Sequence, residues 1–276
     1  RYRAVRGVLA SMLRSLGLIC VKSEQDKERF CRLGVNAEAV LVTGNIKFDQ
    51  PAGKDLDERT NGLRRLFRIT SRHRVIVAGS THKGEEAVLI DMYTELVSRH
   101  PDLVLIVVPR HPHRSGQIVR LIREKGYAPV CRSILESGGQ TDGSTPSDKP
   151  VYIVDTIGEL PYIYNLADVV FVGGSMVPAG GHNPIEPAQL GKAVIFGPHG
   201  YNFRDVERLF LESDSAIRVS SRAELAATVD LLLTDVVRRE KIARGAYEVV
   251  RENKGATRRT FEQVYAFLKK RGVKFQ

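Results

Sequence analysis

The chain has 276 residues, 42% of them hydrophobic and 27% charged, which fits a soluble globular protein of about two domains and excludes fibrous and disordered classes. Its net charge of +10 lies at the two ends, since residues 1–74 carry 16 basic and 8 acidic side chains and residues 237–276 carry 12 and 4. Such ends fit an anionic membrane surface or a solvated helix face; nucleic acid is not expected as a partner, because no aromatic residues interleave with the charges.

No apolar run reaches the roughly 18 residues that a membrane-spanning helix needs. Residues 17–49 predict a strand, a helix and a second strand, with Ser23 as the N-cap of the helix. Because Arg1 already lies in what reads as a helix interior, we expect an N-terminally truncated chain. Residues 1–52 are then the remnant of a larger domain, and the polar residues that follow predict a linker over 53–72.

From residue 75 onward, apolar runs that predict strands alternate with helical patterns. Strands are predicted over 75–80, 103–110, 151–155, 169–174, 193–198 and 216–219. Helices are predicted over 85–99, 116–125, 159–166, from Pro184, over 203–211 and from residue 222. Continuous apolar strands separated by helices predict an α/β fold with a parallel sheet covered on both faces, in a Rossmann-like domain over 73–276. Residues 133–150, rich in Gly, Ser, Thr and Asp, predict an exposed loop.

Polar, glycine-rich segments directly follow five of these strands. They read GSTHKG, PRHPHR, DTIGEL, GGSMVPAGGHNPIEP and GPHGYNF. Ligands of open α/β sheets bind beyond the carboxyl ends of the strands, where such loops converge. The sequence therefore predicts a binding site at this edge.

The longest of these loops predicts an anion site. Its glycines, Gly174 and Gly181 among them, let backbone N–H groups face a ligand, and a helix opening at Pro184 adds a partial positive charge. The alternative is that Asn183 caps this helix, with Pro184 at N1 and Glu186 at N3. Capping leaves the glycines and His182 unexplained, so we expect both roles. Glu186 can also accept hydrogen bonds from a ribose diol.

Two further loops offer groups for a phosphate or sugar. Arg110 and His111 of PRHPHR follow a strand, and arginine suits bidentate phosphate recognition, although a basic surface turn is an alternative. In GSTHKG, Ser80 and Thr81 resemble a second contact. The H-x-H spacing is weak support for a metal, and neither a P-loop nor a G-x-G-x-x-G pattern is present, so no metal or cofactor is expected.

Taken together, these segments resemble the lipid A Kdo transferases. The runs that carry the resemblance are GNIKFD (44–49), AGSTHKGEE (78–86), PRHPHR (109–114), DTIGEL (155–160), ADVVFVGGS (167–175), GGHNPIEP (180–187) and GPHGYNF (197–203). These bacterial GT-B glycosyltransferases transfer 3-deoxy-D-manno-octulosonic acid (Kdo) from CMP-Kdo to a lipid A precursor. The resemblance covers essentially the whole chain. It implies a GT-B fold, with one complete donor-binding domain and the C-terminal remnant of an acceptor domain.

The resemblance also implies site residues, partners and a location. The CMP-binding positions of the family correspond to Pro109, Arg110, Ile157, Gly158, Glu159, Asn183, Pro184, Ile185 and Glu186. The loops add as secondary candidates Ser80, Thr81, His111, Gly174, Ser175, Gly181 and His182. The partners implied are CMP-Kdo, a lipid A precursor and an anionic membrane surface, with lipopolysaccharide synthesis at the cytoplasmic face of the bacterial inner membrane.

The implied reaction is an inverting displacement without a metal, in which a carboxylate of the N-terminal domain acts as the base. Glu24, Glu28 and Glu38 lie outside the family's motif for this base, so the catalytic residue is unassigned and donor binding without transfer is expected. Two other functions fit the same loops. One is a GT-B-like UDP-sugar 2-epimerase, and the other is a non-catalytic module that binds nucleotide sugars.

Overall fold

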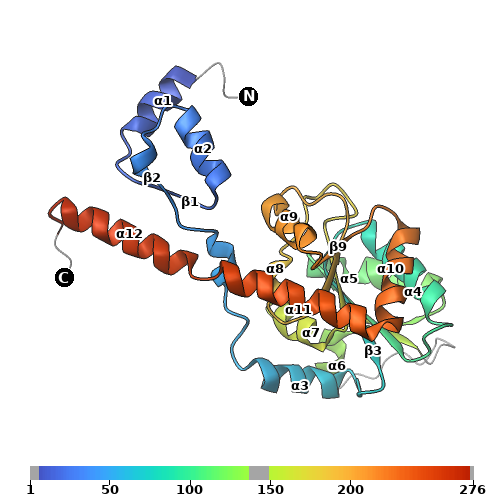
Figure 1. The fold of residues 1–276 in the computed structure, drawn as a ribbon. Coiled ribbons are helices and arrows are strands. Elements are labelled where there is room, and N and C mark those ends of the chain that lie inside the picture. The colour runs from blue at the N-terminus through green and yellow to red at the C-terminus, as the bar shows by residue number, and fades with distance from the viewer. Residues whose placement is uncertain (1–5, 137–148, 274–276) are drawn as a thin grey trace. The chain divides into compact units, whose positions relative to one another are not determined.

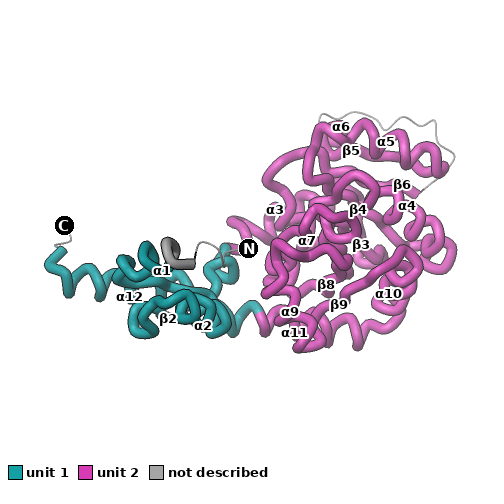
Figure 2. The backbone as a smooth tube through the Cα atoms, turned by 90° about the horizontal axis from the view of Figure 1, so that it is seen from above, with its two compact units in different colours: residues 1–50, 250–276 teal, residues 51–249 magenta. Residues whose placement is uncertain are grey.

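The structure, a computed structural model, describes residues 6–136 and 149–273. Most of the loop expected over 133–150 therefore lies outside the described residues. The chain divides into two compact units, coloured separately in Figure 2. The larger unit is residues 51–249, and the smaller unit combines residues 1–50 with residues 250–276.

A parallel sheet organises the larger unit. Among the described residues it has seven strands in the order β5-β6-β4-β3-β7-β8-β9. Figure 1 shows the fold, with β3 and β9 of this sheet labelled. The strands are β3 (Arg74–Thr81), β4 (Leu103–Pro109), β5 (Ala128–Cys131), β6 (Pro150–Ile153), β7 (Val169–Val172), β8 (Ala193–Phe196) and β9 (Ile217–Arg218). The predicted α/β class with a parallel sheet is confirmed. The sequence missed the edge strand β5, which is short and contains Pro129, a residue that weakens a strand pattern.

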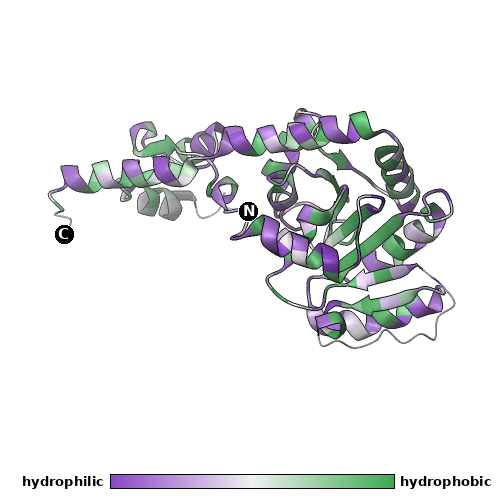
Figure 3. Ribbon diagram, turned by 90° about the horizontal axis from the view of Figure 1, so that it is seen from below, coloured by the Kyte–Doolittle hydropathy of each residue, from purple (hydrophilic) through white to green (hydrophobic). Residues whose placement is uncertain are grey.

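Helices connect these strands. They are α3 (Leu56–Leu66), α4 (Glu85–Leu96), η3 (Pro112–Arg114), α5 (Ser115–Glu124), α6 (Arg132–Glu136), α7 (Leu160–Leu166), α8 (Ile185–Ala188), α9 (Arg204–Glu212), α10 (Arg222–Thr234) and α11 (Val236–Asn253). Figure 3 colours the strands as mainly hydrophobic, whereas the helices alternate between hydrophobic and hydrophilic residues. This is the pattern of a sheet buried on both faces, with helices that expose one side to water.

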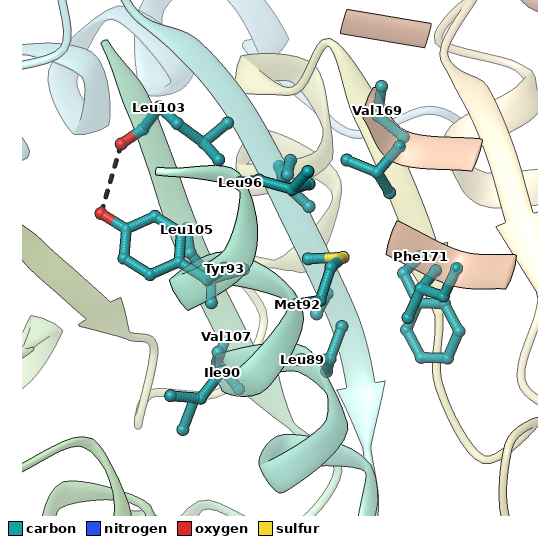
Figure 4. Close-up of a cluster of buried hydrophobic side chains, with 14 of the residues drawn as sticks. Leu89, Ile90, Met92, Tyr93, Leu96, Leu103, Leu105, Val107, Val169 and Phe171 are labelled. Atoms are coloured by element: carbon teal, nitrogen blue, oxygen red, sulfur yellow. Dashed lines mark hydrogen bonds between the residues drawn. The ribbon is translucent and has the colours of Figure 1, made fainter. Parts of the chain in front are cut away.

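The main core lies between α4 and the central strands. Leu89 and Met92 of α4 pack near Phe171 of β7, and all three side chains are fully buried (Figure 4). The hydroxyl of Tyr93 donates to the carbonyl of Leu103 at 3.3 Å, which satisfies the only polar atom of that buried ring. This core fixes the strand ends that carry the loops described below.

The smaller unit has a two-stranded parallel sheet. Its elements are α1 (Arg6–Arg14), β1 (Ile19–Val21), α2 (Glu24–Arg32), η1 (Ala37–Ala39), β2 (Val40–Val42), η2 (Ile46–Asp49) and α12 (Ala256–Lys270). The predicted strand-helix-strand order is confirmed. So is the N-cap, because the Ser23 side chain accepts a hydrogen bond from the amide of Asp26 at 3.2 Å.

Two boundaries differ from those expected. The sequence assigned residues 250–276 to the sheet domain, whereas the structure groups them with residues 1–50. The carboxylate of Asp49 accepts hydrogen bonds from the amides of Gly255 (2.6 Å) and Thr257 (2.5 Å), and so satisfies donors at the start of α12. Pairing between residues so far apart in the chain leaves no periodic signal. The expected linker over 53–72 contains α3, which packs on α7.

None of the helices in the described ranges combines the length and apolar character that crossing a membrane requires.

Candidate functional site

Loops that follow neighbouring strands are joined by hydrogen bonds at the carboxyl edge of the larger sheet. The amide of Arg110, after β4, donates to the carbonyl of Thr81 at the end of β3 (3.0 Å). The amide of His199, after β8, donates to the carbonyl of Ser175 after β7 (2.9 Å). Strand β3 lies between β4 and β7, so the chain connections diverge at this point, where open α/β sheets bind ligands.

A buried carboxylate holds the glycine loop after β7. Glu85 is fully buried at the start of α4, and one of its oxygens accepts from the amides of Ser175 (3.0 Å) and Met176 (2.9 Å). The other oxygen accepts from the amides of Gly174 (2.7 Å) and His82 (2.9 Å). Four backbone donors therefore surround one carboxylate, and the loops after β3 and β7 are fixed to each other.

This arrangement corrects the expected role of the loop. The sequence predicted that amides after β7 face a bound anion, but the amides of Gly174, Ser175 and Met176 bind the chain's own carboxylate. These three amides are therefore not available to a ligand anion. The glycine-rich loop thus encloses a carboxylate of the chain itself.

Two histidines form a pair above this loop. The Nε2 atoms of His82 and His182 lie 2.8 Å apart, and the rings are stacked with centroids separated by 5.0 Å. A Cβ on Gly174 would lie 2.9 Å from the His182 ring, so the glycine makes room for the pair. His111 meets His82 edge-on at 5.9 Å. Among the described residues, no group of three or more His, Cys, Asp or Glu side chains is arranged to hold a metal ion.

The two arginines of the loop after β4 have different surroundings. Arg114 forms a paired contact with the buried Glu86, at 2.6 and 3.2 Å. Arg110 is exposed, and within the described part of the chain its guanidinium makes no hydrogen bond or ion pair. The preceding Pro109 is buried as the last residue of β4. Arg110 is therefore the arginine of this loop that is available to a ligand.

The loop after β6 presents an apolar side chain beside a held carboxylate. Ile157 is 88% exposed, and Gly158 follows with a φ of 88° that favours glycine. Glu159 accepts from Arg132 at 3.0 Å and from the hydroxyl of Thr156. A cleft of about 380 Å³ adjoins this loop, and its lining includes Arg59, Leu63, Leu66, Arg132, Leu135 and Glu159.

The segment 183–186 begins a shorter helix than expected. Helix α8 has four residues and is preceded by Pro184 at the cap position, so the proposed capping scheme is shifted by one residue. Asn183 accepts from the amide of Ile185 (3.1 Å) and donates to Glu186 (3.1 Å). One turn of helix carries little macrodipole, which weakens the predicted anion site at its start. Burial raises the pKa of Glu186, and the hydrogen bond from Asn183 opposes this shift.

Several secondary candidates support the loops from inside. Thr81 is fully buried and donates to Glu86 at 3.0 Å. Ser175 is fully buried as well, and its hydroxyl accepts from the amide of Gly197 at 2.8 Å. Ser80 has a φ of 58°, and Gly181 a φ of 73°. The hydroxyls of Thr81 and Ser175 thus hold neighbouring segments together and are not presented to a ligand.

The sequence reading missed the acidic residues beneath the site. Glu85, Glu86 and Glu207 are each at most 3% exposed. A Cβ on Gly200 would fall 1.7 Å from the Glu207 carboxylate, so this glycine leaves space for it. The available signal was an acidic residue in the first turn of a helix that directly follows a strand loop.

Comparison with known proteins points to one family. A family profile described as 3-deoxy-D-manno-octulosonic-acid transferase (kdotransferase) matches residues 1–50. A 3-deoxy-D-manno-octulosonic acid transferase of Haemophilus influenzae is 32% identical over 271 residues, which are 98% of this chain and 61% of that protein. The chain spans 61% of the length of the Haemophilus protein and 45% of that of a transferase of the same name from Rickettsia felis, so it covers only part of these curated relatives.

Solved structures extend the comparison to the fold. The C-terminal CMP-Kdo binding domain of WaaA from Acinetobacter baumannii has a TM-score of 0.64 and is 26% identical, covering 72% of this chain and 99% of that domain. A UDP-GlcNAc 2-epimerase from Neisseria meningitidis shares the fold with a TM-score of 0.54 at 15% identity, covering 89% of this chain and 61% of that one. The GT-B fold class expected from the sequence is thereby confirmed.

Proposed function

We propose that this chain is part of a Kdo transferase, to which its similarity points, and that its larger unit binds CMP-Kdo at the carboxyl edge of the sheet. The whole protein would act as an inverting glycosyltransferase that moves Kdo to a lipid A precursor in lipopolysaccharide synthesis. The observation that carries the proposal is the placement of the exposed Arg110 next to the loops that follow β3, β6 and β7.

The loops divide the recognition of a cytidine nucleotide between them. Arg110 would bind the phosphate in a charge-assisted, bidentate contact. The exposed Ile157 beside Gly158 offers an apolar face to the base. Glu186, held by Asn183, has acceptor oxygens for the ribose hydroxyls. No metal is required in this scheme, because cationic side chains would stabilise the leaving phosphate.

We further propose that donor binding resides in residues 51–249, whereas transfer needs a base that these residues do not supply. Residues 1–50 contain Glu24, Glu28 and Glu38, and all three are exposed on α2 and η1. An exposed carboxylate lacks the positioning that general base catalysis requires. The 276-residue chain should therefore bind donor without turning it over.

Titration calorimetry with CMP and UDP tests the site. We expect CMP to bind more tightly than UDP, and Arg110→Ala to weaken CMP binding by about 10- to 100-fold, because a charge-assisted hydrogen bond contributes ~1.5–3 kcal/mol. Arg120→Ala, on the exposed face of α5, is the matched control and should leave the affinity unchanged. A preference for UDP would favour the epimerase instead, and CMP binding that Arg110→Ala leaves intact would place the nucleotide elsewhere.

The acceptor is a lipid, so we propose that the smaller unit docks on the anionic cytoplasmic face of the bacterial inner membrane. Residues 1–50 and 250–276 carry 17 basic and 7 acidic side chains, whereas residues 51–249 carry 25 of each. The entire net charge of the protein thus belongs to the smaller unit. Anionic lipid attracts such a unit at about 1 kcal/mol for each basic side chain near the surface.

Helix α12 adds an apolar stripe to this charge. Phe261, Val264, Tyr265 and Leu268 follow the i, i+3, i+4, i+7 spacing of one helix face. The Phe261 side chain is 67% exposed, and its ring stacks on that of Tyr265 at 6.1 Å. An apolar stripe beside cations is the composition of a helix that lies in a bilayer interface.

Vesicle sedimentation tests this docking face. We expect the protein to bind phosphatidylglycerol vesicles and not neutral phosphatidylcholine vesicles. The double variant Phe261→Glu, Tyr265→Glu should bind at least about tenfold more weakly, since it loses the insertion of two aromatic rings. Val237→Glu, at an exposed apolar position of the larger unit, is the control. Equal binding of all three proteins would contradict a role for α12.

A further inference from the structure

The pair formed by His82 and His182 has no place in the nucleotide contacts proposed above. Its two rings come from the loops after β3 and β7, and both are partly exposed at the candidate site. Gly174 beneath them lacks the side chain that would displace His182. The backbone on either side is fixed, because Glu85 binds the amides of both His82 and Gly174. Both histidines are therefore held in place at the edge of the candidate site.

The hydrogen bond between the rings determines which donors, acceptors and charge the pair can present to a ligand. At an Nε2-to-Nε2 distance of 2.8 Å, one Nε2–H donates and the other Nε2 accepts. The accepting ring then carries its hydrogen on Nδ1, whereas the donating ring has a bare Nδ1. A neutral pair thus presents one donor and one acceptor. If the bare Nδ1 takes a proton, the inter-ring bond survives, and the pair presents two donors and a positive charge.

We infer that the pair formed by His82 and His182 is an anion-binding element of the donor site, and that it takes up one proton when a phosphate or carboxylate group binds. The proton comes from solvent and goes to the bare Nδ1 of the donating ring, and no covalent bond forms or breaks. This inference rests on the proposed nucleotide site and deepens it. The ligand class is a monoanionic phosphodiester or carboxylate, both of which a CMP-activated sugar acid contains.

Cationic and titratable groups surround His182 and disfavour its protonation. The charged and titratable groups around it are Arg110 and His111 from the loop after β4, with His113 stacked on His111 at 5.6 Å. The carboxylate of Glu85, in the supporting layer, accepts hydrogen bonds from four amides, that of His82 among them. Burial, followed by the charges of His82, Arg110 and His111, lowers the pKa of His182 to about 4.

A bound anion would offset these cations and raise the pKa of the pair. The protonated pair binds an anion more tightly than the neutral pair does. Affinity should therefore increase as the pH falls from neutral, with the change beginning near the raised pKa of the complex and steepest between that pKa and the lower pKa of the ligand-free protein. A purely structural histidine pair would leave the affinity independent of pH in this range.

The test is calorimetry with the methyl phosphodiester of CMP, whose phosphate keeps a single charge, whereas CMP itself titrates near pH 6. Titrations in two buffers of different ionisation enthalpy measure proton uptake. We expect uptake of up to one proton at pH 6, and binding about tenfold tighter at pH 5.5 than at pH 7.5. His182→Gln and His82→Gln should each remove the pH dependence, while His73→Gln, at the position directly before β3, should keep it.

Each result bears on the inference separately from the proposed function. Binding of the diester without proton uptake would overturn the inference and leave the nucleotide site standing. If the glutamine variants do not fold, the proton uptake measured on the unaltered protein is sufficient to test the inference.

If no cytidine nucleotide binds, the proposed function fails. The pKa of His182, measured by NMR with and without inorganic pyrophosphate, then tests whether the pair binds an anion. A raised His182 pKa then supports an anion site, and an unchanged one overturns it. Free Kdo and cytidine as further titrants distinguish a carboxylate from a phosphate as the bound group.

Discussion

Replacing Glu85 with alanine is expected to lower the free energy of unfolding of the larger unit by roughly 4 kcal/mol. The side chain is fully buried and accepts four backbone hydrogen bonds, and each amide left without a partner costs at least about 1 kcal/mol. Thermal unfolding followed by circular dichroism should show a midpoint lower by about 10 °C. CMP binding should weaken as well, because the loops after β3 and β7 lose their common anchor.

Glu95→Ala provides the comparison for this variant. Glu95 lies on the same helix, but its side chain is half exposed in an ion pair with Arg99. Exposed pairs contribute ~0–1 kcal/mol, so the midpoint should hardly move. Similar midpoints for the two variants would show that water replaces the Glu85 carboxylate at little cost, and the anchoring role would have to be abandoned.

Arg114→Met should destabilise the larger unit by about 3–5 kcal/mol, because it leaves the buried Glu86 carboxylate without its cation. Glu86 is 2% exposed, and the pair is joined by contacts of 2.6 and 3.2 Å. Urea unfolding of Arg114→Met, of Glu86→Leu and of the double variant Glu86→Leu, Arg114→Met forms a double-mutant cycle. The double variant should recover most of the lost stability, since an apolar pair avoids burying a lone charge.

The same set of variants also tests which arginine, Arg114 or Arg110, contacts the phosphate of CMP. The double variant should retain CMP affinity, because Arg114 is already neutralised inside the protein, whereas Arg110 is exposed. Loss of CMP binding in a stably folded double variant would assign the phosphate contact to Arg114. Sequence alone did not distinguish the two arginines, which occupy equivalent-looking positions in PRHPHR.

Strand positions followed from the sequence because burial on both faces leaves an uninterrupted apolar run. The run predicted over 169–174 contains β7, and the loops that follow the strands lie at one edge as expected. The short length of helix α8 was not predicted from the sequence. Asn183 and Pro184 have the composition of a helix start, but Gly191 terminates the segment after a single turn, with a φ of 64°.

Contacts between distant segments are what the sequence could not supply. The glycines after β7 predicted an enclosed anion, yet the sequence did not show that the anion is Glu85, which lies about ninety residues earlier. In the same way, Asp49 fixes the start of α12 from the other end of the chain. Periodicity reports which face of a segment is buried, whereas such pairings depend on where separate segments meet.

Because Glu85 already occupies the amide-lined loop, this part of the site has its final shape before any nucleotide arrives. A ligand then does not have to order the loop, so little conformational entropy is lost there on association. Preorganisation of this kind favours discrimination by fit. A nucleotide that does not match the fixed edge of β3 and β7 cannot induce a loop rearrangement to accommodate itself.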